Sequence, residues 1–162
     1  RVSDFEIKLM DIDSEHLKIP EAKYTAVIKM PSSEFRRIVS DLQVIGETVI
    51  IEVNKSGASF QVSGDLGKGN ICLHSNPSAD QENAVSIEMS EPIQMTFALR
   101  FLNNFAKASS LTDTVTLQMR KDLPLTVEFE LDKGESGFLK FYLAPKIEDG
   151  DTPPETQPET AE

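Results

Sequence analysis

The sequence FALRFLNNFAKASSLTDTV, residues 97–115, joins a helix pattern directly to a strand pattern. Apolar residues three and four positions apart predict an amphipathic helix over residues 98–110. The residues expected on its inner side are Phe101, Leu102, Phe105 and Ala108. The alternation that begins at Thr114 predicts a strand immediately after the helix. A helix that leads straight into a strand favours a domain of the α+β class.

The same order of elements extends to both sides of this stretch. A strand over residues 85–97, interrupted by Pro92, precedes the helix, and strands near 114–119, 125–131 and 137–143 follow it. Upstream, the expected elements are a strand at 24–30, a helix at 33–45 and strands near 47–53, 58–63 and 68–74. We expect Ser32 to be the N-cap of the first helix and Gly46 to stop it.

An offset of 66 residues aligns the two sets of elements. It pairs Phe35 with Phe101, Val39 with Phe105, Leu42 with Ala108, Ile45 with Leu111, and Thr48-Val49 with Thr114-Val115. A strand-helix-three-strand unit that occurs twice predicts a pseudo-symmetric α+β domain.

The two ends of the chain differ from this duplicated part. Residues 2–10 alternate between apolar and polar side chains, which predicts a strand, and residues 11–21 form a connector. Six acidic residues and no basic residue lie in 148–162, together with three prolines, so we expect this tail to be disordered. Because the chain lacks an initiator Met and opens inside a strand pattern, we expect it to be a piece of a longer protein.

Composition limits the classes of function. A net charge of −11 argues against a protein that binds nucleic acid by neutralising the charge of its phosphates. No apolar run is long enough to span a membrane. The single Cys72 excludes an internal disulfide framework and fits a reducing compartment. With His16 and His74 far apart in sequence, a zinc site is not expected, and we expect no cofactor.

Two proline-bearing apolar segments lie where the chain leaves regular structure. One is FYLAPKI, residues 141–147, and the other is LKIP, residues 17–20, with Tyr24 nearby. Exposed apolar loops mark docking surfaces, so one interpretation is a partner-binding site. The other is that each segment covers its own core, and the pattern alone leaves both open.

The outer sides of the two predicted helices are basic and amide-rich. The first carries Arg36, Arg37, Ser40, Gln43 and Val44, with Asp41 at the edge, and the second carries Arg100, Asn103, Asn104 and Lys107. Such a stripe is either a solvated helix face or a surface that contacts the phosphates of a polyanion.

Sequence motifs for catalysis are absent. There is no Gly-x-Ser-x-Gly, no His-Glu-x-x-His and no P-loop, and Gly64–Gly69 reads as a turn between strands. The spacing of Asp11, Asp13 and Glu15 could hold calcium, but the glycine and the terminal glutamate of a calcium-binding loop are missing. This favours a solvated acidic connector. We therefore expect no enzymatic activity; the alternative is a hydrolase that uses a buried pair of carboxylates.

Three stretches carry a resemblance to a known family. LAPKIED at 143–149, KLMDIDSEHL at 8–17 and the stretch 97–115 resemble the second half of a eukaryotic replicative sliding clamp of the proliferating cell nuclear antigen family. The resemblance implies a DNA-clamp fold with helices on one face of curved antiparallel sheets. It also implies that residues 1–10 are the last strand of a missing N-terminal domain, 11–21 the interdomain connector and 22–147 the C-terminal domain. A checkpoint-clamp paralogue is the alternative within this fold.

The resemblance also assigns residues to surfaces. The partner-binding groove takes Leu17, Ile19, Pro20, Tyr24, Pro124, Tyr142, Leu143, Ala144, Pro145 and Ile147. The DNA-facing residues are Arg36, Arg37, Ser40, Arg100, Asn103, Asn104 and Lys107, and the subunit interface takes Phe5, Ile7, Asn70 and Cys72.

The implied function is that of a DNA polymerase processivity factor in the nucleus. It acts as a homotrimeric ring around double-stranded DNA. The implied partners are a clamp loader, DNA polymerases, a flap endonuclease and DNA ligase. Lys55 matches a position that takes ubiquitin after DNA damage, and Lys18 a second modified position; because Pro20 replaces the acid of the modifier's consensus there, we favour Lys55.

Overall fold

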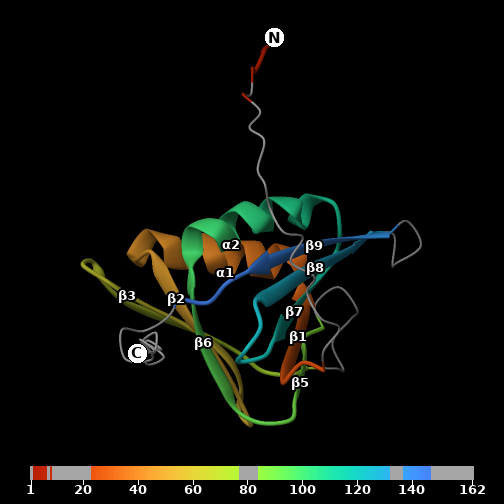
Figure 1. Cartoon of the computed structure of the whole chain (residues 1–162). Helices are drawn as coiled ribbons and strands as arrows, with labels where there is room; N and C mark the ends of the chain where they lie inside the picture. Colours follow the sequence, from red (N-terminus) through yellow and green to blue (C-terminus); the bar gives the residue numbers. More distant parts are fainter. Residues whose placement is uncertain (1, 7, 9–22, 77–83, 132–136, 147–162) are drawn as a thin grey trace, which may run out of the picture.

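The computed structural model describes residues 2–6, 8, 23–76, 84–131 and 137–146, and in these ranges two helical segments lie against two antiparallel sheets (Figure 1). The first set of elements is β1 (Ala26–Pro31), α1 (Ser32–Ile45), β2 (Thr48–Asn54), β3 (Gly57–Gly64) and β4 (Gly67–Leu73). The second set is β5 (Ser86–Met89), β6 (Ile93–Ala98), α2 (Leu99–Phe105), the 3₁₀ helix η1 (Ala106–Ser110), β7 (Thr114–Met119), β8 (Leu125–Leu131) and β9 (Gly137–Leu143).

Each helix carries the chain from one sheet to the other. β1 lies in the five-stranded sheet, of order β5-β1-β7-β8-β9, whereas the strands that follow α1 lie in the four-stranded sheet, of order β4-β3-β2-β6. The second set mirrors this exchange, since β6 pairs with β2 and β7 pairs with β1. Figure 1 shows both helices on the same side of the sheets. The α+β class and the duplicated strand-helix-three-strand unit are therefore confirmed.

Pro92 marks a change of sheet. The sequence pattern predicted one interrupted strand over 85–97, but β5 pairs with β1 and β6 pairs with β2. A proline cannot donate to a ladder, so the chain leaves the first sheet after Met89 and enters the second at Ile93.

The core lies between the helices and the inner faces of the sheets. Phe35 on α1 and Phe129 on β8 are both fully buried, and their ring centroids lie 6.4 Å apart. Phe141 on β9 lies edge-on to Phe129 and stacks on Phe105 of α2 at 4.7 Å. Burying a side chain of this size stabilises the fold by about 1.5–3 kcal/mol. The aromatic contacts thus join both helices to the five-stranded sheet.

The predicted cap of the first helix is wrong. Pro31 occupies the N-cap position, and the Ser32 hydroxyl donates to the backbone carbonyl of Ser109 at 3.2 Å and also contacts that of Thr112. Because Ser32 is buried beneath the end of η1, its hydroxyl bridges the two helical segments instead of accepting a bond from its own helix. The predicted stop at Gly46 is confirmed, and its N–H donates to the carbonyl of Leu42.

Phe101 does not lie on the inner side of the second helix as predicted. It is 39% exposed, and Leu102 fills the core position beside it. The starts of the two helices, Ser32 and Leu99, are related by an offset of 67 residues, which pairs Phe35 with Leu102. The offset returns to 66 at Thr48 and Thr114, after the tighter turns of η1. The predicted offset of 66 residues is therefore correct for the strands that follow the helices, but it is one residue too small at the helix starts.

The strand predicted over residues 2–10 is not formed by its described members. Residues 2–6 and 8 have no strand conformation, Phe5 is 88% exposed, and this segment extends away from the sheets (Figure 1). A strand needs a neighbouring ladder to satisfy its backbone groups, and none of the described strands pairs with it.

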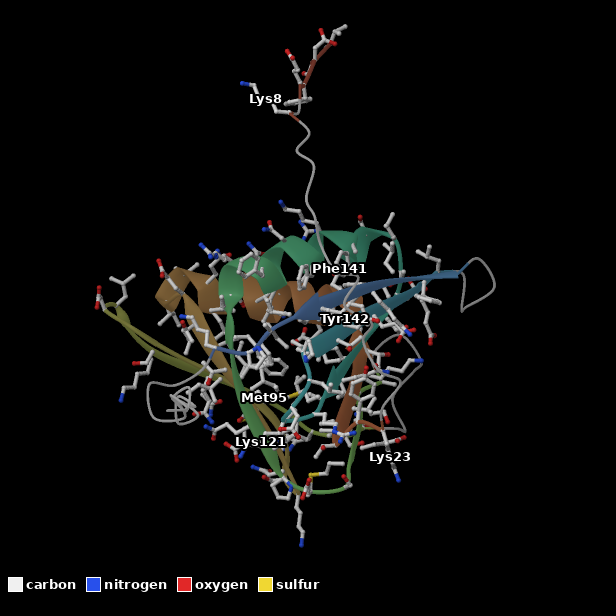
Figure 2. The ribbon with its side chains drawn as sticks, in the orientation of Figure 1. Lys8, Lys23, Met95, Lys121, Phe141 and Tyr142 are labelled. Carbon is white, nitrogen blue, oxygen red and sulfur yellow. The ribbon has the colours of Figure 1, made fainter. Side chains whose placement is uncertain are left out.

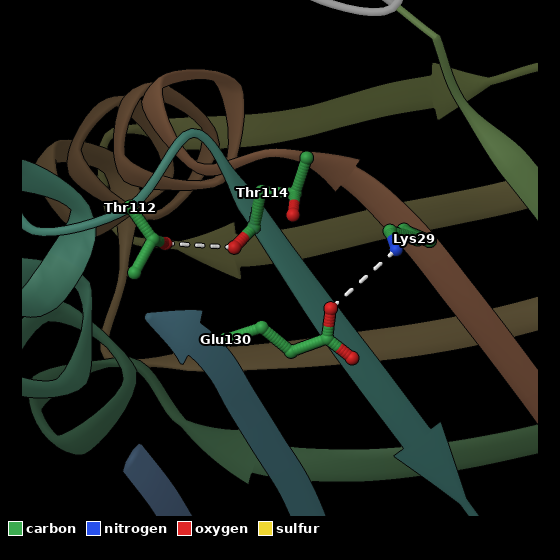
Figure 3. A network of polar contacts seen from close by, with 4 residues as sticks. All are labelled: Lys29, Thr112, Thr114 and Glu130. Carbon is green, nitrogen blue, oxygen red and sulfur yellow. Dashed lines mark hydrogen bonds and ion pairs between the residues drawn. The ribbon is translucent and has the colours of Figure 1, made fainter. Parts of the chain in front are cut away.

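The face of the five-stranded sheet away from the helices carries two ion pairs. There Lys29 on β1 and Glu130 on β8 form an ion pair at 3.9 Å (Figure 3). Lys140 on β9 pairs with Glu128 on β8 at 3.3 Å. At the start of β7, the Thr112 hydroxyl donates to the carbonyl of Thr114 at 2.8 Å (Figure 3). The Lys29–Glu130 pair is exposed, and exposed ion pairs contribute little stability.

Candidate functional site

The outer side of the helices carries the residues assigned to DNA contact. Six of the seven are exposed, namely Arg36, Arg37, Ser40, Arg100, Asn104 and Lys107. The start of α1 lies against η1 through Ser32, and its end lies against α2 through Gln43. The helices are therefore antiparallel, and their outer stripes run side by side.

Asn103, the seventh residue, bridges the helices. Its amide Nδ2 donates to Oε1 of Gln43 at 2.5 Å, and the residue is half-buried. Nothing in the sequence paired these two residues, which are 60 positions apart. The hydrogen bond uses one of the two amide protons of Asn103, so this residue links α2 to α1.

The cations on this face differ in their surroundings. Nε of Arg37 lies 3.8 Å from Oδ2 of Asp41, one turn along α1. The Arg100 guanidinium lies over the ring of Phe101, with Cζ 4.6 Å from the ring centroid. Among the described residues, no carboxylate lies within ion-pair distance of Arg36, Arg100 or Lys107. The face therefore presents cations and amides without base-reading geometry, which suits contact with phosphates.

The described part of the candidate groove lies on the outer face of the five-stranded sheet. The Tyr24 hydroxyl is 3.1 Å from Oγ1 of Thr126 on β8, and Thr126 is the register partner of Tyr142 on β9. Pro124 directly precedes Leu125, which pairs with Leu143. The structure thus brings Tyr24, Pro124 and Tyr142 to one region. Leu17, Ile19, Pro20 and Ile147 lie outside the described residues.

The last strand serves both the core and the surface. Phe141 packs toward the helices, whereas its neighbour Tyr142 is 42% exposed on the other side (Figure 2). Leu143 is buried and belongs to the core. Of the two interpretations left open for the segment 141–147, core covering holds for Leu143, whereas Tyr142 and Ala144 are exposed and remain candidates for partner binding.

The segment after β9 is fixed to the other sheet. The backbone N–H of Lys146 donates to the carbonyl of Thr96 on β6 at 2.8 Å, and its Nζ donates to Oγ1 of Thr48 at 2.7 Å. These bonds hold Pro145 between the two sheets. Lys146 also borders a hollow of ≈ 650 Å³ on the four-stranded sheet, whose polar lining includes Gln61, Lys68 and Asn70.

Among the described strands, β4 lies at an edge of the four-stranded sheet and pairs only with β3. The two-residue turn between Gly64 and Gly67 closes on a hydrogen-bonded pair, and such pairs alternate along an antiparallel ladder. The backbone groups of Asn70 and Cys72 therefore point away from β3, and both side chains are exposed. Of the other predicted interface residues, Phe5 lies in no strand and Ile7 lies outside the described residues.

A family model described as "Proliferating cell nuclear antigen, C-terminal domain" matches residues 18–147. The chain belongs to this family. The match includes every helix and strand described above. Sliding clamps are non-catalytic processivity factors, so membership gives the chain a sliding-clamp type of function. It also implies association with DNA, self-association as a ring and binding of replication proteins in general.

Lys55 lies at the tip of a well-defined turn in this clamp domain. Oδ1 of Asn54 accepts hydrogen bonds from the N–H and hydroxyl of Ser56, and the Ser56 carbonyl lies 2.8 Å from Nδ1 of His74. Gly57 adopts φ 139°, and a Cβ there would lie 2.1 Å from the carbonyl oxygen of Leu73. The turn is thus held on both sides while Lys55 itself is exposed. Lys18 lies outside the described residues.

The structure also bears on the alternatives to a clamp. In the described ranges, no group of three or more His, Cys, Asp or Glu side chains is placed to hold a metal, and no helix is long and apolar enough to cross a membrane. Asp11, Asp13 and Glu15 lie outside those ranges. The buried polar residues described are Ser32 and Thr126, and neither is a carboxylate. The hydrolase alternative required a buried carboxylate pair, so the described core does not support it.

Proposed function

We propose that the chain is the C-terminal half of a eukaryotic replicative sliding clamp that encircles duplex DNA. The paired outer stripes of α1 and α2 carry this proposal, because they place Arg36, Arg100 and Lys107 on one side of the molecule. In a ring, this side faces the hole and contacts phosphates without reading sequence. A net charge of −11 keeps such contacts weak, and the linkage to DNA is topological. Weak phosphate contacts suit sliding.

Ring closure in this proposal uses sheet edges. The outward backbone groups of Asn70 and Cys72 on β4 are ready to pair with a strand of a neighbouring subunit. We propose that residues 3–8 supply that strand, with Phe5 and Ile7 as its apolar members. This partner strand is consistent with the exposure of Phe5, because its apolar side chain is uncovered within this chain. A head-to-tail contact of this kind closes into a ring, for which we propose three subunits.

Client proteins dock in the groove between the connector and the end of β9. Tyr24, Pro124, Tyr142, Ala144 and Pro145 form its described wall, and we assign Leu17, Ile19, Pro20 and Ile147 to the same site. A client peptide with a short helical turn and aromatic anchors fits this apolar surface. The clients we propose are DNA polymerases, a flap endonuclease and DNA ligase, with a clamp loader that opens the ring. The segments LAPKIED and KLMDIDSEHL favour the replicative clamp over a checkpoint paralogue.

Lys55 is the proposed site of ubiquitin attachment after DNA damage. Its exposed position in a rigid turn makes Nζ accessible without unfolding the sheet. A modifier attached there adds a second binding module to the ring and raises the local concentration of damage-tolerant polymerases. This role, like the replicative one, places the protein in the nucleus.

The size of the particle in solution tests the proposal. The experiment compares this chain alone with this chain mixed with the preceding half of the subunit, by light scattering. A complex that contains three copies of each half supports the proposal. A mixture that stays at the size of the separate halves, or of a single pair, contradicts ring formation.

A further inference from the structure

We propose that Phe101 is a positioning residue for Arg100, and that α2 with η1, rather than α1, supplies the main contact with the DNA backbone. This inference rests on the proposed function. It starts from an aromatic side chain that is out of place: Phe101 is 39% exposed although neighbouring Leu102 is fully buried. The exposed part of the ring is available to a neighbouring side chain on the same helix face.

The role follows from the contact that the ring makes. The Arg100 guanidinium lies over its face, with Cζ 4.6 Å from the ring centroid, within the range of a cation–π interaction. A stacked guanidinium keeps its N–H donors at its edge, where they remain free to bind phosphate. The ring therefore restricts the side chain of Arg100 to few conformations, and less freedom is lost when Arg100 binds.

The charges of the two helices favour α2. Within α1, Glu34 and Asp41 balance Arg36 and Arg37, and Asp41 lies 3.8 Å from Arg37. Within α2 and η1, residues 99–110, there are two basic side chains, those of Arg100 and Lys107, and no acidic one. An exposed neutral residue, Val44, further weakens the face of α1.

The bridge between the helices supports this division. Asn103 lies one turn after Arg100 and donates to Gln43 on α1 at 2.5 Å. The bond joins α2 to α1 one turn away from Arg100. In this arrangement α1 acts chiefly as the support of α2.

The test is a titration of this chain with a short DNA duplex at low and moderate salt, followed by NMR. In Arg100→Ala we expect a loss of affinity of about threefold and a shallower salt dependence, because one phosphate contact is removed. Phe101→Leu keeps the charge of the helix and an apolar side chain but loses the ring. Its affinity for DNA should lie between those of the wild type and Arg100→Ala. Phe101→Tyr keeps the ring and should match wild type. Arg36→Ala is the matched change on α1, and it should reduce the affinity for DNA less than Arg100→Ala does.

A double-mutant cycle separates positioning from a general effect on the fold. Because Phe101 acts through Arg100, adding Phe101→Leu to Arg100→Ala should not reduce the affinity for DNA any further. The same loss in both backgrounds, or an unchanged affinity of Phe101→Leu, overturns the inference. An equal loss in Arg36→Ala and Arg100→Ala overturns the assignment of the main contact to α2. If the wild-type chain shows no shift with DNA at either salt concentration, this inference fails, whereas the proposed function is tested separately by ring formation.

Discussion

Tyr24 and Thr126 are 102 residues apart in the sequence, and their side-chain hydroxyls lie 3.1 Å apart across the outer face of the five-stranded sheet. The contact ties the segment before β1 to β8. Thr126 is buried, so its hydroxyl depends on this partner. The bond therefore holds Tyr24 against β8, at the residue whose register partner on β9 is Tyr142.

Removing this hydrogen bond should lower stability. We expect Tyr24→Phe to reduce the free energy of unfolding by about 1 kcal/mol, a typical value for a net hydrogen bond. Urea unfolding measures the change. Thr126→Val is the reciprocal variant, and the double variant should cost less than the sum of the two single changes. Strict additivity of the two changes would show that the hydroxyls do not interact.

Tyr142 should be an anchor for clients. Because it is exposed, Tyr142→Ala should leave the unfolding midpoint near that of wild type. It should weaken the binding of a client peptide by roughly 1–3 kcal/mol, the range for an apolar anchor. Isothermal titration calorimetry measures the affinity.

Phe138→Ala is the matched control for this prediction. Phe138 is an exposed aromatic residue of the same strand, at its other end, and lies outside the proposed groove. Equal losses in the two variants would contradict the location of the groove. Leu143 is unsuitable for this test, because it belongs to the core, and Leu143→Ala should cost about 2–5 kcal/mol of stability.

Assembly should depend on the outward edge of β4. A proline at position 72 removes an N–H that points away from β3, so Cys72→Pro should weaken ring formation more than it disturbs the sheet. Light scattering of the complete subunit measures assembly, and circular dichroism reports the fold. Cys72→Ser keeps the donor and should assemble normally. Normal assembly of a folded Cys72→Pro variant would exclude this edge from the interface.

Lys55 should be required for tolerance of template damage. Lys55→Arg keeps the charge and the turn but removes the amine that takes the modifier. Cells that carry it should lose the damage-induced conjugate and become sensitive to agents that block replication. Lys121→Arg changes an exposed lysine in a different hairpin turn and should behave as wild type (Figure 2). Normal damage tolerance in cells carrying Lys55→Arg would refute the assignment.

The sequence predicted the strands better than the helix starts. The bounds of β7, β8 and β9 agree with the alternation, because each of these strands has a regular pattern between turn residues. Phe101 was misplaced because a helix pattern of period 3.6 tolerates a rotation by one residue, and the tighter η1 shifted the repeat. The role of Ser32 was missed because its partners lie 77 and 80 residues away.

In the candidate site, the residue types were predictable from the sequence, but their contacts with one another were not. Local spacing predicted the exposed stripe on α1 and most of that on α2. The hydrogen bonds from Asn103 to Gln43 and from Lys146 to Thr48 depend on how the elements meet in space. Likewise, alternation alone could not tell that β5 and β6 lie in different sheets.

Topological linkage to DNA is the central claim of this account. In the decisive measurement, the complete subunit is loaded by its clamp loader onto nicked circular DNA, and gel filtration follows it before and after the DNA is cut. If the ring encircles DNA, the protein should elute with the circle, leave the DNA once it is linear, and be retained again when both ends are blocked. Equal retention on circular and cut DNA, or none on either, would contradict encirclement.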